Sequence, residues 1–91
     1  MYKVTYDGRV VTEDLKRIDT FAKNRIRKVI EFKLATQPEI FGKPLRQSLS
    51  GFRVLRVGNY RIMFLVKSKN VIILLICHRQ FVYKEAEKRL E

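Results

Sequence analysis

The stretch "FRVLRVGNYRIMF", residues 52–64, predicts a β-hairpin around which a sheet can be built. Two runs of β-branched and aromatic residues flank Gly58 and Asn59, a pair that favours a two-residue turn. Such a turn places Arg56 directly opposite Arg61 on one face of the sheet. Like charges in this position repel each other, so we expect an anion to lie between the two arginines.

Further strands are predicted on either side of this hairpin. Residues 2–6 read as a short first strand, and three strands at about 52–57, 60–67 and 70–78 form an antiparallel meander. The last of these is almost free of polar side chains, which is typical of a strand flanked by neighbours in the centre of a sheet.

Helical periodicity follows the first strand in two series of apolar residues, and we place the break at Asp19 and Thr20 because either can cap the second helix. The helical hairpin would cover one face of the sheet and leave the other for function. Residues 35–51, which contain both prolines, are expected to be a long surface loop, and residues 82–91 a short helix. The apolar series are Val11, Leu15, Ile18 and Ala22, then Ala22, Ile26, Val29, Ile30 and Leu34.

The predicted fold is therefore α+β, a single domain over residues 1–91 with the order strand, two helices, three strands and short helix. The chain has 20 Lys+Arg against 9 Asp+Glu, a net charge of +11, which points to nucleic acid or an acidic protein as partner. The apolar run 71–77 is too short to span a membrane and the N-terminus does not resemble a signal peptide, so we expect a cytoplasmic protein. Cys77 and His78 are the only residues of their kinds, so we expect no disulfide, metal site or cofactor.

The facing arginines are the first candidate site. Arg56 and Arg61 offer planar guanidinium forks suited to phosphate, although the alternative that both simply point into water stays open. Arg53 lies three residues before Arg56, so the two share a face only if a bulge occurs near residues 53–55.

A second candidate group, "HRQFVY", follows the last strand. His78 can titrate near neutral pH, Arg79 can stabilise developing negative charge, and Tyr83 can stack on a base or pass a proton. Such residues at a strand end are also often structural. Lys43 and Arg46 in "GKPLRQ" form a third group that could contact phosphates from a loop, against the simpler reading of an exposed basic loop.

No motif for a metal site, a phosphate-binding loop, a nucleophilic serine or cysteine, or a helix-turn-helix is present in the sequence. A basic protein without these can still cleave RNA, because the ribose 2′-OH supplies the nucleophile. The protein then has to position that hydroxyl and stabilise the charged transition state.

The segments "KPLRQSLSGF", "LRVGNYRIMF" and "HRQFVYKEAEKRL" together resemble the RelE/ParE superfamily of bacterial and archaeal toxins over nearly the whole chain. The resemblance implies a RelE-like fold and a toxin of a type II toxin–antitoxin system. In the RelE branch such toxins are metal-independent endoribonucleases that cleave mRNA in the ribosomal A site by 2′-OH attack on the adjacent phosphate. It also implies a monomeric toxin that contacts mRNA and rRNA on the ribosome and forms a hetero-oligomer with a cognate acidic antitoxin.

The resemblance assigns roles to individual positions. Arg56 and Arg61 match the family's basic sheet residues, while Arg79 and Tyr83 match an arginine and a tyrosine used in phosphate stabilisation and base stacking. His78 matches a histidine of some close relatives. Lys43 and Arg46 fall in the family's basic loop, and we expect both of them, together with Arg53, to contact RNA.

The chain also departs from the family pattern. It has Asn59 where an aspartate is common, Cys77 where a glycine often stands, and Phe81 where a charged residue is frequent. The sheet lacks the glutamate that serves some relatives as base, so the general base is unassigned.

Two alternatives to the ribonuclease remain. ParE-type relatives share the fold and inhibit DNA gyrase without cutting RNA, and a basic nucleic-acid-binding module would have no toxicity. The presence of Arg79 and Tyr83 together with the sheet arginines favours the ribonuclease.

Overall fold

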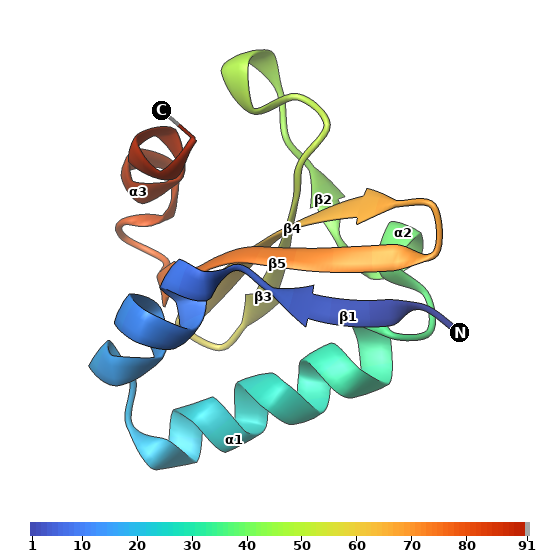
Figure 1. The fold of residues 1–91 in the computed structure, drawn as a ribbon. Coiled ribbons are helices and arrows are strands. Elements are labelled where there is room, and N and C mark those ends of the chain that lie inside the picture. The colour runs from blue at the N-terminus through green and yellow to red at the C-terminus, as the bar shows by residue number, and fades with distance from the viewer. Residues whose placement is uncertain (91) are drawn as a thin grey trace.

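Five strands form one sheet, in the order β1-β5-β4-β3-β2, in the computed structural model, which describes residues 1–90 (Figure 1). β1 runs parallel to β5, and every other neighbouring pair is antiparallel. The α+β fold and the three-strand meander are thus confirmed, with β5 lying between two neighbours as expected. The strands are β1 (Lys3–Tyr6), β2 (Lys43–Pro44), β3 (Arg53–Val57), β4 (Tyr60–Lys67) and β5 (Asn70–His78).

The predicted hairpin joins β3 to β4 in the expected register, with Arg56 opposite Arg61. The left-handed φ of +57° falls on Gly58 and not on Asn59, as in a type II′ turn, whose first central position favours glycine. The β3–β4 ladder runs without a slip, so there is no bulge near residues 53–55. Arg53 and Arg56 therefore point to opposite faces of the sheet.

The helices precede the hairpin, and their predicted break is confirmed. Asp19 caps α1 (Thr20–Val29) by accepting a 2.9 Å hydrogen bond from the Ala22 backbone N–H. The first predicted helix is instead two short helical turns, Val10–Asp14 and Leu15–Arg17, and a wider turn, Ile30–Leu34, extends α1. No helix within residues 1–90 has the length and apolar character needed to cross a membrane.

These helical segments cover one face of the sheet, as predicted (Figure 1). Apolar side chains from the helices and from alternate strand positions form the larger core there, which is the burial that holds the two layers together. Its buried members are Val10, Ile18, Ile26, Ile30, Leu34, Leu55, Val57, Ile62, Phe64, Val71, Ile73 and Ile76.

The segment 35–51 is not the featureless surface loop expected from its prolines. It contains α2 (Pro38–Phe41), the edge strand β2 and a helical turn, Gln47–Leu49. Because β2 is at the edge of the sheet, its proline needs no ladder hydrogen bond on the outer side. This strand brings Lys43 opposite Val54 and so onto the sheet.

The second face of the sheet is also partly covered, contrary to the expectation that it would be left open. α3 (Val82–Arg89) packs Val82 and Ala86 onto it, one helical turn apart. A second core results, and the end of this face beside Arg56 and Arg61 remains accessible. Its buried members are Leu49, Val54, Met63, Leu75, Val82 and Ala86.

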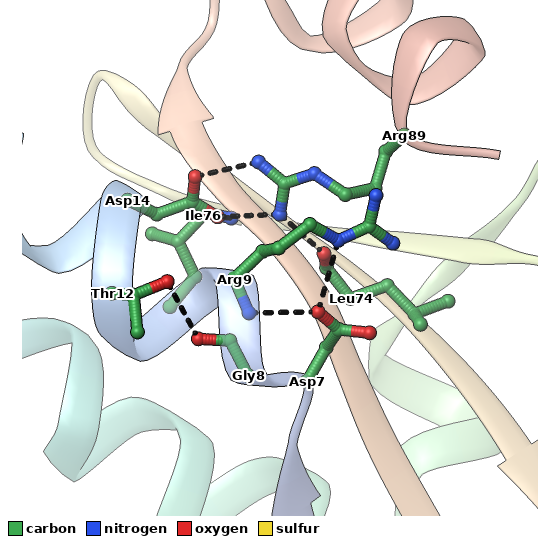
Figure 2. Close-up of polar contacts among 8 residues, drawn as sticks. All are labelled: Asp7, Gly8, Arg9, Thr12, Asp14, Leu74, Ile76 and Arg89. Carbon is green, nitrogen blue, oxygen red and sulfur yellow. Dashed lines mark hydrogen bonds and ion pairs between the residues drawn. The ribbon is translucent and has the colours of Figure 1, made fainter. Parts of the chain in front are cut away.

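A buried ion pair fastens α3 to the helical turns near the N-terminus. The Arg89 guanidinium donates to the Asp14 carboxylate and to the Leu74 carbonyl, while Asp14 accepts from the Ile76 backbone N–H (Figure 2). The β4–β5 register shifts here, since Phe64 pairs with Ile73 but the next pair skips Leu74. The ion pair therefore satisfies backbone groups of β5 around the bulge, beyond the end of β1.

Candidate functional site

A groove of about 520 Å³ lies on the accessible end of the second sheet face, between β2, the β3–β4 hairpin and the start of α3. Apolar side chains form part of its lining, and cationic side chains come from β2, β3, β4 and the segment between β5 and α3. We call it the arginine groove. It is lined by Lys43, Leu45, Val54, Arg56, Arg61, Arg79, Gln80, Val82 and Tyr83.

One of the two facing arginines in this groove, Arg61, is hydrogen-bonded to the hairpin turn. Arg61 donates from Nη1 to the carbonyls of Gly58, at 3.0 Å, and Tyr60, at 2.9 Å, so its side chain is directed to the hairpin turn. Partial burial lowers the pKa of the Arg61 guanidinium, and the positive charges of Arg56 and Arg79 lower it further. Within residues 1–90 no carboxylate lies within ion-pair distance of these three arginines. The groove is therefore a site of uncompensated positive charge that suits a phosphate.

Arg79 and Tyr83 enter the groove from the end of β5 and the first turn of α3. The Arg79 backbone N–H donates to the Asn59 carbonyl at 2.8 Å, which ties the segment after β5 to the hairpin turn. Tyr83 keeps 60% of its surface exposed, so its ring can stack on a base without displacing another side chain. These two residues and the sheet arginines, predicted separately, thus come together in one place.

Lys43 and Arg46, which were predicted to lie in a basic loop, are also found at or beside the groove. Lys43 lines the arginine groove, whereas Arg46 lines an adjoining cavity of about 360 Å³ that shares Lys43 and Tyr83 with it. Both cations are exposed. Arg46 therefore adds a positive charge beside the arginine groove.

Arg53 lies outside the groove. Its guanidinium donates to the carbonyls of Glu39, at 2.7 Å, and Gly42, and so fixes the end of α2 against the sheet. Gly42 has no room for a side chain, since a Cβ there would lie 2.2 Å from the Phe64 ring. The Arg53 side chain therefore binds the backbone of its own chain, whereas the Arg56 side chain lines the groove.

His78 also lies outside the groove, at the cross-strand position opposite Tyr60. Its Nδ1 accepts a 3.2 Å hydrogen bond from the Gln80 backbone N–H. In the neutral ring this bond keeps the proton on Nε2, which is then a donor. His78 is therefore unsuited to act as a general base on a substrate in the arginine groove, because Nδ1 is occupied and the ring does not line the groove.

Cys77 is the remaining polar residue at this end of β5, beside Arg61 in the neighbouring strand. Burial raises the pKa of its thiol to about 12, and the negative charges of Asp14 and Glu85 act in the same direction. The thiol is therefore protonated at neutral pH and is not a nucleophile.

Asp14 and Arg89 were not identified from the sequence, although the second core depends on how they hold α3. The signal available was the spacing of Val10, Asp14 and Ile18, which places a carboxylate on a buried helical face. Nothing in the sequence pattern pointed to Arg89 as its partner, 75 residues away.

The fold and the groove define a small α+β protein whose sheet carries a concentrated basic site. The family model described as ParE toxin of type II toxin-antitoxin system, parDE, matches residues 9–83. The chain therefore belongs to the RelE/ParE superfamily of type II toxins.

Individual relatives agree with this membership. The toxin RelG of Mycobacterium tuberculosis is 30% identical over 84 residues, which cover 87% of this chain and 97% of RelG. The toxin–antitoxin complex RelBE2 of the same organism contains a chain with a TM-score of 0.80 and 28% identity, over 86% of this chain and 91% of that one. The RelB–RelE complex of Methanococcus jannaschii shows the same fold, with a TM-score of 0.67 and 23% identity over 88% of this chain and 95% of that one.

Proposed function

We propose that the arginine groove binds mRNA in the ribosomal A site and cleaves it, making this chain a metal-independent endoribonuclease. The observation that carries the proposal is the meeting of Arg56, Arg61 and Arg79 in one groove, where no carboxylate among the described residues lies at ion-pair distance. Their charges are left for a polyanion, and the exposed Tyr83 ring beside them suits a nucleobase.

In the proposed reaction the ribose 2′-OH attacks the adjacent phosphorus. A new P–O2′ bond forms, the bond to the 5′ oxygen of the next nucleotide breaks, and the products are a 2′,3′-cyclic phosphate and a free 5′-hydroxyl. The phosphate gains negative charge in the transition state, which Arg61 and Arg79 stabilise with Arg56. Lys43 and Tyr83 are the groove side chains able to exchange a proton during the reaction.

The residues outside the groove receive different roles. Arg53 acts through the backbone of α2 and not on RNA, and Arg46 contacts a phosphate beyond the cleavage site. His78 is not the base in this proposal, because its Nδ1 is occupied and it lies off the groove. The proposed roles of Arg53 and His78 thus differ from those expected from the sequence, whereas Arg46 keeps its expected role.

We further infer that an acidic antitoxin segment covers the groove in the stored state. The RelBE2 and RelB–RelE structures are toxin–antitoxin complexes, and the net charge of +11 here favours an acidic partner. Expressed alone in the cytoplasm, where ribosomes are accessible, the chain should arrest growth. Overproduction without arrest in the native host, with no acidic partner on co-purification, would contradict this inference.

The main test is in vitro translation with primer extension on the message, run with wild type and Arg61→Ala. New 5′ ends within codons of the message should appear only when both ribosomes and the wild-type protein are present. Because the matching family model is a ParE one, gyrase supercoiling is assayed in parallel. Inhibition of supercoiling without message cleavage would replace the ribonuclease with the gyrase inhibitor.

A further inference from the structure

A second cavity, of about 470 Å³, opens on the other side of the end of β5. Its size is within the range of small-molecule sites, about 300–1,000 Å³. None of the side chains that carry the proposed cleavage lines it. We call it the aromatic cavity, and the lining residues relevant here are Arg17, Tyr60, His78, Gln80, Phe81 and Glu85.

Three rings stand together in this cavity. The Tyr60 and His78 centroids are 6.2 Å apart in an edge-on arrangement, and the His78 and Phe81 centroids are also 6.2 Å apart, with an interplanar angle of 58°. Phe81 remains 51% exposed although it has a neighbouring ring to pack against. Its ring offers a surface on which another flat ring can stack.

Polar groups surround these rings in a pattern that suits the edge of a base. Arg17 supplies N–H donors, Glu85 supplies acceptors, and Gln80 supplies both. The His78 Nδ1 is occupied by the Gln80 backbone, so the neutral ring has Nε2–H as its remaining donor. A cavity with an aromatic wall and mixed donors and acceptors fits a heterocyclic base better than an aliphatic side chain.

The position of the cavity links it to the arginine groove. His78 lines the aromatic cavity and Arg79, the next residue, lines the groove, while Gln80 lines both. A single-stranded RNA whose phosphate rests on Arg79 can therefore extend across Gln80 and place a neighbouring base over Phe81. We propose that the aromatic cavity is a nucleobase subsite for a nucleotide adjacent to the cleaved phosphate, with Phe81 as its stacking platform. This inference rests on the proposed function.

The test compares two short ligands, an oligoadenylate and a ribose-phosphate oligomer of the same length without bases. Both are 2′-O-methylated so that neither can be cleaved, and binding to the full chain is measured by fluorescence anisotropy at low ionic strength. The variant Phe81→Leu removes the ring but keeps an apolar side chain. Phe32→Leu is the matched control, because Phe32 is 75% exposed on the helical turn after α1, away from both cavities.

Phe81→Leu should weaken oligoadenylate binding about tenfold and leave the base-free oligomer unaffected. Phe81→Tyr, which keeps a ring, should bind like wild type, and Phe32→Leu should change neither ligand. Arg79→Ala should weaken both ligands, because it removes a phosphate contact. Equal thermal unfolding of Phe81→Leu and wild type excludes a folding defect.

If Phe81→Leu binds both ligands like wild type, or weakens both equally, the nucleobase subsite is refuted. That result leaves the proposed ribonuclease intact, provided that wild type still cuts messages on the ribosome. Conversely, a wild type that cuts no message overturns the proposed function whatever the oligomers show.

Discussion

Arg89 and Asp14 make a two-point ion pair in the interior, with Nη2 2.8 Å from Oδ1 and Nη1 3.1 Å from Oδ2. Both side chains are at least nine-tenths buried. The same two groups satisfy the carbonyl of Leu74, at 2.9 Å, and the N–H of Ile76, at 3.0 Å (Figure 2). One pair of charges thus joins α3, an N-terminal helical turn and the bulged part of β5.

Removing either partner should strongly destabilise the fold. Asp14→Asn or Arg89→Met leaves the other charge buried without a counterion, which typically costs about 3–5 kcal/mol. The double variant should lose less than the sum of the two single losses. The free energy of unfolding in urea measures each effect.

The control for this prediction is Asp7→Asn, which removes the exposed pair between Asp7 and Arg9 near the same site (Figure 2). It should cost about 1 kcal/mol or less, because solvent screens such pairs. If Asp7→Asn and Asp14→Asn lowered the free energy of unfolding by similar amounts, the buried pair would contribute no more to stability than the exposed one.

Arg61 and Arg53 should separate activity from stability. Arg61→Ala is expected to lower message cleavage about a hundredfold, by losing transition-state stabilisation, without lowering the melting temperature. Relief of repulsion from Arg56 offsets the two hydrogen bonds that Arg61 makes to turn carbonyls. Arg53→Met should instead lower the melting temperature, because it frees the carbonyls of Glu39 and Gly42. The opposite pattern would make Arg53 the functional residue.

Tyr83 should show graded losses of cleavage. Tyr83→Phe keeps the stacking surface and loses the hydroxyl, whereas Tyr83→Ala loses both. Since the ring is 60% exposed, neither change should shift thermal unfolding by much. A melting temperature that falls in step with cleavage in Tyr83→Ala would mean that the ring only anchors α3.

Gly42 should be far less tolerant of a methyl group than Gly8. Gly42→Ala places a Cβ 2.2 Å from the buried Phe64 ring and should destabilise by about 1–3 kcal/mol. Gly8→Ala meets no atom within 4 Å and does not require a left-handed φ, so it should be neutral or slightly stabilising. Denaturation curves of Gly42→Ala and Gly8→Ala measure the two free energies of unfolding. Equal values would contradict the tight packing at Gly42.

Because of Cys77, the free energy of unfolding should fall as the pH rises through the alkaline range. Because burial raises the pKa of the thiol to about 12, the folded chain keeps a proton that the unfolded chain, with a pKa of about 8.5, releases. The thiol's contribution is therefore complete below the unfolded pKa and is lost as pH rises through the folded one. The difference in unfolding free energy between wild type and Cys77→Ala should narrow over that range, and a constant difference would contradict the raised pKa.

The parts of the fold that follow from local chemistry were the ones predictable from the sequence. Gly58 and Asn59 determine a two-residue turn, which determines the register of Arg56 and Arg61 and hence half of the groove. Asp19 likewise marked the start of α1.

The features that the sequence did not reveal depend on contacts between distant segments. The strand β2 forms because Lys43 and Pro44 pair with the edge of β3. The sequence of these two residues alone has no strand pattern. The backbone groups around the bulge in β5 are hydrogen-bonded by a carboxylate and a guanidinium that lie 75 residues apart in the sequence. Whether His78 and Arg79 share a site depends on which side of a strand end each one faces.

The parallel pairing of β1 with β5 also sets the order in which the chain can fold. Residues 3–6 leave the ribosome early, but their partners, residues 70–73, are synthesised much later. Long-range parallel pairing of this kind is slow, and until it happens β1 has no neighbour in the sheet. The end of β5 also delivers Arg79 to the groove. Completion of the sheet and completion of the basic site therefore occur together, and a nascent chain interrupted before residue 70 has neither.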